Sequence, residues 1–290
     1  MMSMNPTNLV LHTATRSLIL QQNLVDALAN QLQAKVKEQL ANGSVRLHQI
    51  QLSDTLRQQV EQQCFDAKID LYWEDKPRAL ADFKLVAMDM DSTLITIECI
   101  DEIADMQGLK AQVSEITEAA MRGELEFQES LLRRVALLKG LEAGALEQVY
   151  EERLKLSLGA ENMLAAVQSF GLKTLLVSGG FTFFTDRIKQ RLNLDFTHAN
   201  QLEIVDGKLT GKVIGTIVDA EEKKRTVERV CAELGISTTE AIVMGDGAND
   251  LKMMSIAGLS VAFRAKPVVR QQAKLAFNFV GLDGILNILQ

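Results

Sequence analysis

Three short apolar runs, each followed by polar or glycine-rich residues and then by a helical pattern, constrain the fold more than any other feature. They cover residues 84–90, 173–178 and 241–246. Such runs are typical of strands that are buried on both faces, and strand–helix repeats build open parallel sheets. We therefore predict an α/β fold with a Rossmann-like parallel sheet and helices on both faces. Ligands of such sheets bind beyond the carboxyl ends of the strands, so the residues that follow each run are the first candidates for chemistry.

The length of 290 residues suggests about two domains. Residues 1–80 predict a small α/β unit, with strands at 8–12, 45–52 and 70–74 and helices at 17–40 and from Ser53 to about Cys64. The apolar phase of the second strand slips at residues 48–49, which indicates a bulge. The charged segment 74–78, which contains Pro77, is the best linker candidate.

Residues 81–290 form the second predicted domain. Between its first two strands, residues 100–170 have a nearly continuous helical pattern, far longer than one crossover needs. We therefore predict a small helical cap, inserted at about residues 98–165 over the sheet. Residues 202–213 alternate around Asp206-Gly207, which predicts a β-hairpin.

Composition excludes several classes of partner. The formal net charge is −7, so the chain is expected to bind neither nucleic acid nor an anionic membrane surface, and an anionic substrate would need local cations or a metal. Neither a long apolar run nor a secretory signal is evident, so we expect no membrane span and a cytoplasmic location. An odd number of separated cysteines indicates free thiols in a reducing compartment: Cys64, Cys99 and Cys231.

Two aspartates follow the first predicted strand directly. On extended backbone Asp89 and Asp91 point to the same side. One can act as an ionised nucleophile, while the other, crowded by it, holds a proton more readily and can act as a general acid. A calcium-type loop or a solvated turn is the alternative for this pair on its own.

Two further turns and a lysine complete the candidate site. Ser178, Gly179 and the helix that follows them could cradle an anion. The acidic turn 245–250, which contains Asp246, offers the hard oxygens that Mg²⁺ prefers. One lysine of the run 223–225 could neutralise a phosphate, although such a run is usually a solvated helix face. Each turn could also be a plain connection, but the strand ends of one parallel sheet converge, so these groups should meet in one crevice.

The ordered series DMDST at 89–93, SGG at 178–180, a lysine and GDGAND at 245–250 resembles the four motifs of the haloacid dehalogenase-like phosphohydrolases. The resemblance covers about residues 83–290. Within that superfamily the chain is most similar to the phosphoserine phosphatase family, whose cap pattern fits Glu98 and the segment 127–138. Lys223 fits the motif better than Lys224, which stays open as the alternative. Residues 1–80 resemble the amino-acid-sensing modules of some relatives. They are therefore candidates for a role in regulation or in oligomerisation, for example in forming a homodimer.

The resemblance implies hydrolysis of O-phospho-L-serine to L-serine and phosphate, the last step of serine biosynthesis. Asp89 would be the nucleophile that forms an aspartyl phosphate, and Asp91 the acid for the leaving group and then the base for water. Mg²⁺ would be held by the side chains of Asp89 and Asp246 and by the backbone carbonyl of Asp91. Asn249 and Asp250 would support the metal or its waters.

The same resemblance implies a set of residues that bind the small-molecule substrate. The phosphate would be held by Ser178, Gly179 and Lys223, the ammonium group by Glu98, and the carboxylate by Arg134. The cap would be lined by Met121 and Phe127, and Asn249 would lie near the metal.

Two other functions remain open at this point. One is a related Mg²⁺-dependent phosphatase that acts on another small phosphomonoester, such as a phosphocholine-like compound or a sugar phosphate. The other is a regulator without catalysis that binds an amino acid through residues 1–80. An intact catalytic set weighs against the second, because a pure binding protein has no use for both Asp89 and Asp91.

Overall fold

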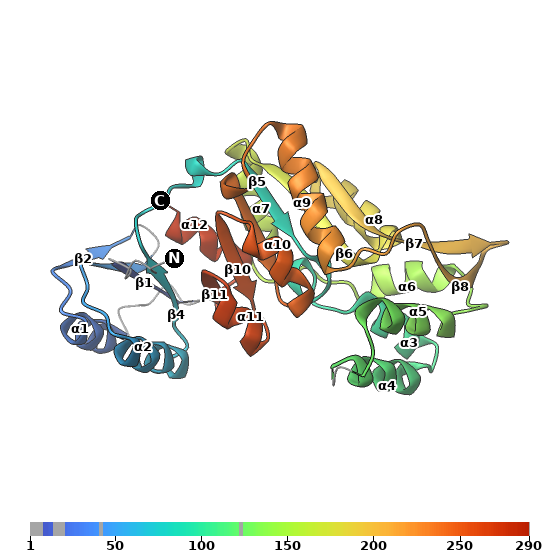
Figure 1. Ribbon diagram of the computed structural model, residues 1–290, viewed down its shortest axis with the longest axis horizontal. Coiled ribbons are helices and arrows are strands. Elements are labelled where there is room, and N and C mark those ends of the chain that lie inside the picture. Colours follow the sequence, from blue (N-terminus) through green and yellow to red (C-terminus); the bar gives the residue numbers. More distant parts are fainter. Residues whose placement is uncertain (1–7, 14–20, 41–42, 122–123, 290) are drawn as a thin grey trace.

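The computed structural model describes residues 8–13, 21–40, 43–121 and 124–289, and its larger sheet is parallel except at one edge (Figure 1). The strand order is β11-β10-β9-β5-β6-β7-β8, and β8 is antiparallel to β7. In that order the strands span Leu275–Phe277, Leu259–Phe263, Ala241–Gly245, Leu85–Met88, Lys173–Phe181, Phe196–Val205 and Lys208–Ile214. The predicted parallel sheet is confirmed, and its three predicted strands are the neighbours β9, β5 and β6.

Helices cover both faces of this sheet because its strands alternate apolar side chains between two cores. Val86 and Met88 belong to the core that also holds residues of α7, α8 and α12, whereas Leu85 and Ala87 belong to the core under α9, α10 and α11. These helices span, in chain order, Ala160–Ser169, Thr182–Leu192, Ala220–Leu234, Leu251–Ser255, Pro267–Gln272 and Ile285–Ile288.

Four helices form the cap, at the lower right of Figure 1. They span Cys99–Met106 (α3), Lys110–Met121 (α4), Phe127–Leu137 (α5) and Gly144–Glu152 (α6). The predicted hairpin is β7–β8, with positive φ angles of 50° at Asp206 and 76° at Gly207. It reaches the cap, where the Gly140 N–H donates to the Leu209 carbonyl over 2.8 Å.

The N-terminal residues form a second sheet, which is antiparallel in the order β2-β3-β1-β4. Its strands are Val36–Gln39, Val45–His48, Asn8–His12 and Asp70–Glu74, and the helices α1 and α2 span Gln22–Gln31 and Asp54–Asp66. A separate apolar core lies between this sheet and its helices, so the predicted small α/β unit is confirmed as a fold. Below, residues 8–74 are called the N-terminal unit.

The predicted helix at 17–40 is wrong in its second half, and residues 14–20 lie outside the described part of the chain. Helix α1 ends at Gln31, Gln33 has a φ of +49°, and Val36–Gln39 pair with β3 as an edge strand. All four side chains of that strand are exposed. They therefore carry no apolar alternation, and their helix-compatible composition concealed the strand.

Two smaller predictions for this unit also fail. The second strand ends at His48, because Gln49 adopts a φ of +52°, so the slip in phase marks the end of the strand instead of a bulge. Glu74 is no linker residue. It belongs to β4, is fully buried, and has its Oε2 3.1 Å from Arg46 Nε.

The N-terminal unit is attached to the core at the β11 edge. Asp70 is 2% exposed, and its carboxylate accepts hydrogen bonds from the backbone N–H groups of Asn278, Phe279 and Val280 over 2.8, 2.9 and 2.9 Å. Arg46 also donates to the Ile288 carbonyl over 3.3 Å. The junction therefore combines buried polar bonds between residues far apart in sequence with apolar packing, because Val10, Leu40 and Tyr72 belong to the core of the larger sheet.

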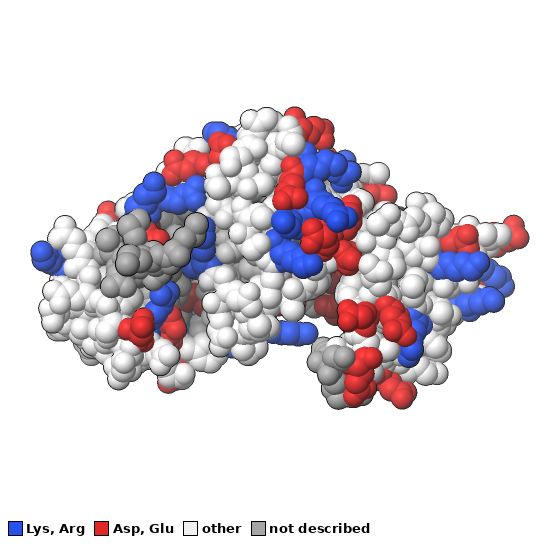
Figure 2. Space-filling view, viewed as in Figure 1, with Lys and Arg blue, Asp and Glu red and all other residues white. Residues whose placement is uncertain are grey.

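Figure 2 shows basic and acidic side chains interspersed over the viewed face. Within the described ranges, we find no helix with the length and apolar character that crossing a membrane requires.

Candidate active site

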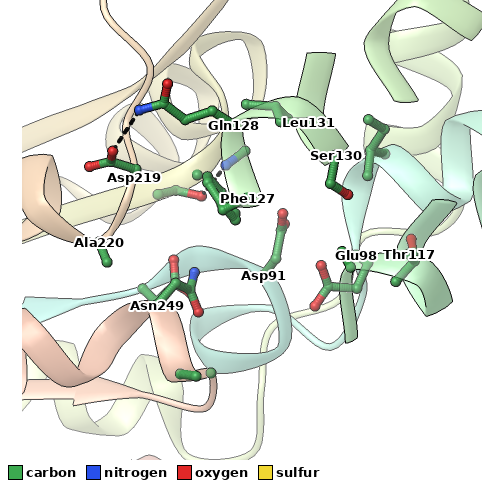
Figure 3. Close-up of a pocket in the computed structure, with 18 of the residues that line it drawn as sticks. Asp91, Glu98, Thr117, Phe127, Gln128, Ser130, Leu131, Asp219, Ala220 and Asn249 are labelled. Atoms are coloured by element: carbon green, nitrogen blue, oxygen red, sulfur yellow. Dashed lines mark hydrogen bonds between the residues drawn. The ribbon is translucent and has the colours of Figure 1, made fainter. Parts of the chain in front are cut away.

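The carboxyl ends of β5, β6 and β9 meet at one edge of the sheet, beneath the cap (Figure 3). A cleft of about 930 Å³ lies between them. Its core-side lining includes Asp89, Asp91, Ser178, Gly179 and Asp246. The convergence expected of parallel strand ends is therefore present, because β5 lies between β9 and β6 in the sheet.

Lys223 does not line the cleft but contacts Asp89, which does, and is itself fully buried. Its Nζ is 2.8 Å from Asp89 Oδ1 and 2.7 Å from Asp250 Oδ1. Burial alone would lower the pKa of this ammonium group, but the carboxylates of Asp250 and Asp89 together raise it. Lys224 instead faces Glu228 at 3.7 Å on a partly exposed side of α9, so it is Lys223 that joins the cluster.

Three carboxylates cluster here, and two of them, Asp89 and Asp250, contact that ammonium group. One oxygen each of Asp89, Asp246 and Asp250 lie within 4.8 Å of one another. Burial, and then the charge of Asp250, raise the pKa of Asp89 well above its usual range and that of Asp246 to about 7. Such crowding of hard oxygen donors at a strand end fits a divalent cation of the Mg²⁺ type, whose charge would relieve the repulsion.

Backbone and hydroxyl donors hold this cluster in place. Asp250 Oδ2 accepts from the N–H groups of Gly247 and Asp246 over 3.0 and 3.2 Å. Thr93 Oγ1 donates to Asp246 Oδ1 over 3.0 Å. Asn249, in the same turn, lines the cleft.

Asp91 has the character of a proton donor. Burial, and then the charge of Glu98, raise its pKa to about 8, so the carboxyl group is mostly protonated at neutral pH. Its Oδ1 is buried without a hydrogen-bond partner among the described residues. A Cβ at position 180 would lie 2.9 Å from Asp91 Oδ2, so a residue other than glycine there would collide with this carboxyl group.

The carboxyl-terminal end of β6, where its register with β7 shifts after Val177, supplies small groups beside Asp91. Ser178 is buried, and its Oγ accepts from the Gly180 N–H over 2.8 Å. A Cβ at Gly179 would approach the Phe127 ring to 3.1 Å, so cap and core are in close contact there.

The cap side of the cleft carries the predicted head-group residues. Helix α5 contributes Phe127 and Arg134, and Arg134 Nε donates to the Ser130 carbonyl over 3.4 Å. Burial lowers the pKa of Arg134, while Asp101 and Glu98 oppose that change. Glu98, at the wall of the cleft, accepts from Ser92 Oγ over 2.6 Å. The structure therefore brings these residues to one cleft.

Met121 ends α4, and its side chain lies outside the described part of the structure. Several lining residues were missed by the sequence analysis. Ser92 stands inside the DMDST motif itself, and Gln128 directly follows Phe127. Asp219, which caps α9, had a detectable signal, because an aspartate before Ala-Glu-Glu is a typical helix start.

A parallel sheet with this acidic, lysine-containing site and an inserted helical cap defines a class of hydrolase. The family described as haloacid dehalogenase-like hydrolase matches residues 83–258, and the chain belongs to that family. A phosphoserine phosphatase from Polaromonas sp. strain JS666 is 56% identical over 216 residues, which cover 73% of this chain and 92% of the relative.

Solved structures extend the similarity to the N-terminal unit. A HAD family hydrolase from Salmonella enterica serovar Typhi matches with a TM-score of 0.86 and 34% identity, over 98% of this chain and 99% of the other. A probable phosphoserine phosphatase from Vibrio cholerae in unliganded form matches with a TM-score of 0.81 and 34% identity, over 98% and 86%.

Proposed function

We infer that this chain is a phosphoserine phosphatase, which hydrolyses O-phosphoserine to serine and phosphate and so completes serine biosynthesis. The observation that carries the proposal is the buried Lys223, in contact with Asp89 and Asp250 at the bottom of a cleft whose cap side includes Arg134 and Glu98. The similarity to named phosphoserine phosphatases supports the same conclusion.

The two ends of the cleft suit the two ends of phosphoserine. Lys223, Ser178 and the Gly179 backbone would hold the phosphate oxygens. Arg134, with its planar fork of donors, would take the carboxylate, and Glu98 the ammonium group. Phe127 and Met121 would give the cap an apolar lining that excludes water.

The carboxylate cluster would hold Mg²⁺ through the side chains of Asp89 and Asp246 and the backbone carbonyl of Asp91, with Asn249 and Asp250 in support. When bound, this ion supplies charge neutralisation between a carboxylate nucleophile and a phosphate dianion.

The first chemical step uses both aspartates of the DMDST motif. Asp89 attacks phosphorus, so a bond from its carboxylate oxygen to phosphorus forms while the bond from phosphorus to the serine oxygen breaks. Serine alkoxide is a poor leaving group, and Asp91, protonated near neutral pH, gives it the proton.

The second step returns the enzyme to its starting state. Asp91, now ionised, takes a proton from water, and the water oxygen bonds to phosphorus. The bond between phosphorus and Asp89 breaks, and inorganic phosphate leaves. Lys223, whose Nζ lies beside Asp89 Oδ1, would stabilise this carboxylate as the leaving group of the step.

A panel of small phosphomonoesters, assayed for phosphate release with Mg²⁺, tests this function. Phosphoserine should be the best substrate by kcat/KM. Chelation with EDTA should stop turnover and added Mg²⁺ restore it, while excess Ca²⁺ should inhibit because its looser shell misplaces the nucleophile. A sugar phosphate or phosphocholine as best substrate would favour the related phosphatase, and binding of serine without hydrolysis would favour the regulator.

The division into units at 1–80 and 81–290, with the cap at about 98–165, is part of this proposal. Two separate sheets support it, and the N-terminal unit has an apolar core of its own between its sheet and helices. A chain that begins at Ala81 should retain hydrolysis although its stability falls, because the N–H groups of 278–280 lose their acceptor. A folded but inactive product would contradict the division. A homodimer and a cytoplasmic location stay predictions, to be tested by sedimentation and by cell fractionation.

A further inference from the structure

A hydrogen bond joins the cap to the core at the mouth of the cleft (Figure 3). Gln128 Nε2 donates to Asp219 Oδ2 over 2.8 Å. Gln128 is the second residue of α5 in the cap, and Asp219 is the N-cap of α9 in the core. Both residues line the cleft, yet the chemistry described above uses neither of them.

Asp219 presents one oxygen to the cap because its other oxygen is already engaged. Its Oδ1 accepts from the backbone N–H groups of Glu221 and Glu222 over 3.0 and 2.9 Å. The carboxylate therefore sits at the positive end of α9, where a negative charge is favoured. The bond from Gln128 is charge-assisted and has a fixed acceptor.

Each end of this link adjoins a group that recognises substrate. On the core side, the Lys223 N–H donates to the Asp219 carbonyl over 2.9 Å, so the phosphate-binding lysine lies one helical turn away. On the cap side, Arg134 lies on the same helix as Gln128, about two turns further along. Any shift of α5 against α9 therefore changes the separation of Arg134 from Lys223.

We propose that Gln128 and Asp219 are positioning residues, which set the distance between the phosphate site of the core and the carboxylate site of the cap. This inference rests on the proposed function, because a substrate must carry both groups to need that distance. An aryl phosphate has no carboxylate, so its hydrolysis does not depend on where α5 lies.

A pair of substitutions that reverses the hydrogen bond tests the inference. Gln128→Glu places two carboxylates opposite each other, and kcat/KM for phosphoserine should fall about tenfold. In Asp219→Asn the one remaining side-chain oxygen can still cap α9, and the new amide can donate to the Gln128 side-chain oxygen once the Gln128 amide turns over, so kcat/KM should stay within about threefold of wild type. In the double variant the asparagine amide donates to the new carboxylate, and kcat/KM should recover to within about threefold. With p-nitrophenyl phosphate, all four proteins should agree within about threefold.

Gln148→Glu is the matched control. Gln148 lies on α6 of the same cap, is exposed, and donates to Glu152 of its own helix over 3.2 Å. The substitution adds the same charge beside a carboxylate but away from the cleft, so activity toward both substrates should equal that of wild type.

Hydrogen–deuterium exchange of residues 127–137 gives a readout that needs no phosphoserine turnover. Exchange should accelerate in Gln128→Glu and return to the wild-type rate in the double variant. If the exchange rates of the variants follow this pattern but the wild-type protein does not hydrolyse phosphoserine, the proposed function fails. The hydrogen bond between Gln128 and Asp219 would still stand as a link between cap and core. Equal losses with both substrates, or a double variant as slow as Gln128→Glu, would overturn the positioning role.

Discussion

The core has two neighbours, the N-terminal unit and the cap, and it holds them in opposite ways. At the junction with the N-terminal unit, Asp70 is 2% exposed and accepts three backbone N–H groups. Across the cleft, the bond between Gln128 and Asp219 lies in contact with solvent. Breaking a buried polar bond leaves groups that water cannot reach, whereas an exposed bond exchanges with water at little cost. The first arrangement suits permanent attachment, and the second suits a cap that admits substrate.

The difference between the buried junction and the exposed cleft predicts a rule that experiments can test. Residues of the junction should change the free energy of unfolding and leave turnover intact. Residues of the cleft should change turnover and leave the free energy of unfolding nearly intact.

The largest effect is expected at the nucleophile. Asp89→Asn should lower kcat by at least about a thousandfold and leave no phosphoenzyme to trap, because an amide is a poor nucleophile. The free energy of unfolding should stay equal or rise, since one of three crowded carboxylates is neutralised while Lys223 keeps Asp250 as its partner. Steady-state kinetics and urea unfolding measure both; activity within tenfold of wild type would remove Asp89 from its role.

Next in size is the junction carboxylate. Asp70→Ala should lower the free energy of unfolding by about 4 kcal/mol, because three buried N–H groups lose their acceptor. At temperatures where the variant is folded, kcat should match wild type. The control is Asp66→Ala at the exposed end of α2, where a change within about 0.5 kcal/mol is expected. A large loss of kcat in folded Asp70→Ala would contradict the rule, because the junction would then affect turnover as well as stability.

The junction should also respond to acid. Burial lowers the pKa of His12 from 6.5 to about 4, and its Nε2 lies 3.0 Å from Asn287 Nδ2, a donor from the C-terminal end of the core. The unfolded chain binds this proton more readily than the folded one. Stability is therefore lost as the pH falls from about 6.5 to about 4, by about 3 kcal/mol in total.

Urea unfolding across that pH range measures this contribution. The decrease in the free energy of unfolding on acidification should be smaller by that amount in His12→Gln. It should be unchanged in His48→Gln, because the His48 side chain is more accessible and bonds Glu38. Identical pH profiles for wild type and His12→Gln would place the acid sensitivity elsewhere.

The smallest expected effect concerns the head-group residue of the cap. Arg134→Ala should lower kcat/KM for phosphoserine by about 10- to 100-fold, since a hydrogen bond to a charged group contributes about 1.5–3 kcal/mol. Aryl phosphate should be nearly unaffected, and phosphoethanolamine, which lacks the carboxylate, should be a poor substrate that is indifferent to the change.

The adjacent Arg133→Ala is the control for that variant. Arg133 is exposed and pairs with Glu129 on the same helix, so its loss should alter neither substrate. If Arg134→Ala weakened all three substrates equally, its role would be general and the case for phosphoserine would lose its specific support.

Those parts of the protein that depend on neighbours along the chain could be predicted from the sequence. Apolar runs at 84–90, 173–178 and 241–246 specified the strands, because burial on both faces demands continuous apolar residues. The polar residues that follow these runs could be recognised from their position along the chain. Their convergence on one cleft followed from the geometry of parallel strands. Asp206-Gly207 predicted its hairpin, since both residues tolerate a positive φ.

Contacts between distant segments could not be predicted in this way and became clear from the packing of the elements. Adjacent lysines 223 and 224 have the same chemistry, and the orientation of α9 buries one beside Asp89 and leaves the other near solvent. The strand at 36–39 exists because β3 offers it an edge, against its own helical composition. Gln128 and Asp219 stand 91 positions apart, and nothing local marks either as the partner of the other. Periodicity records which face of an element is buried, but pairing depends on how elements pack, which no single segment encodes.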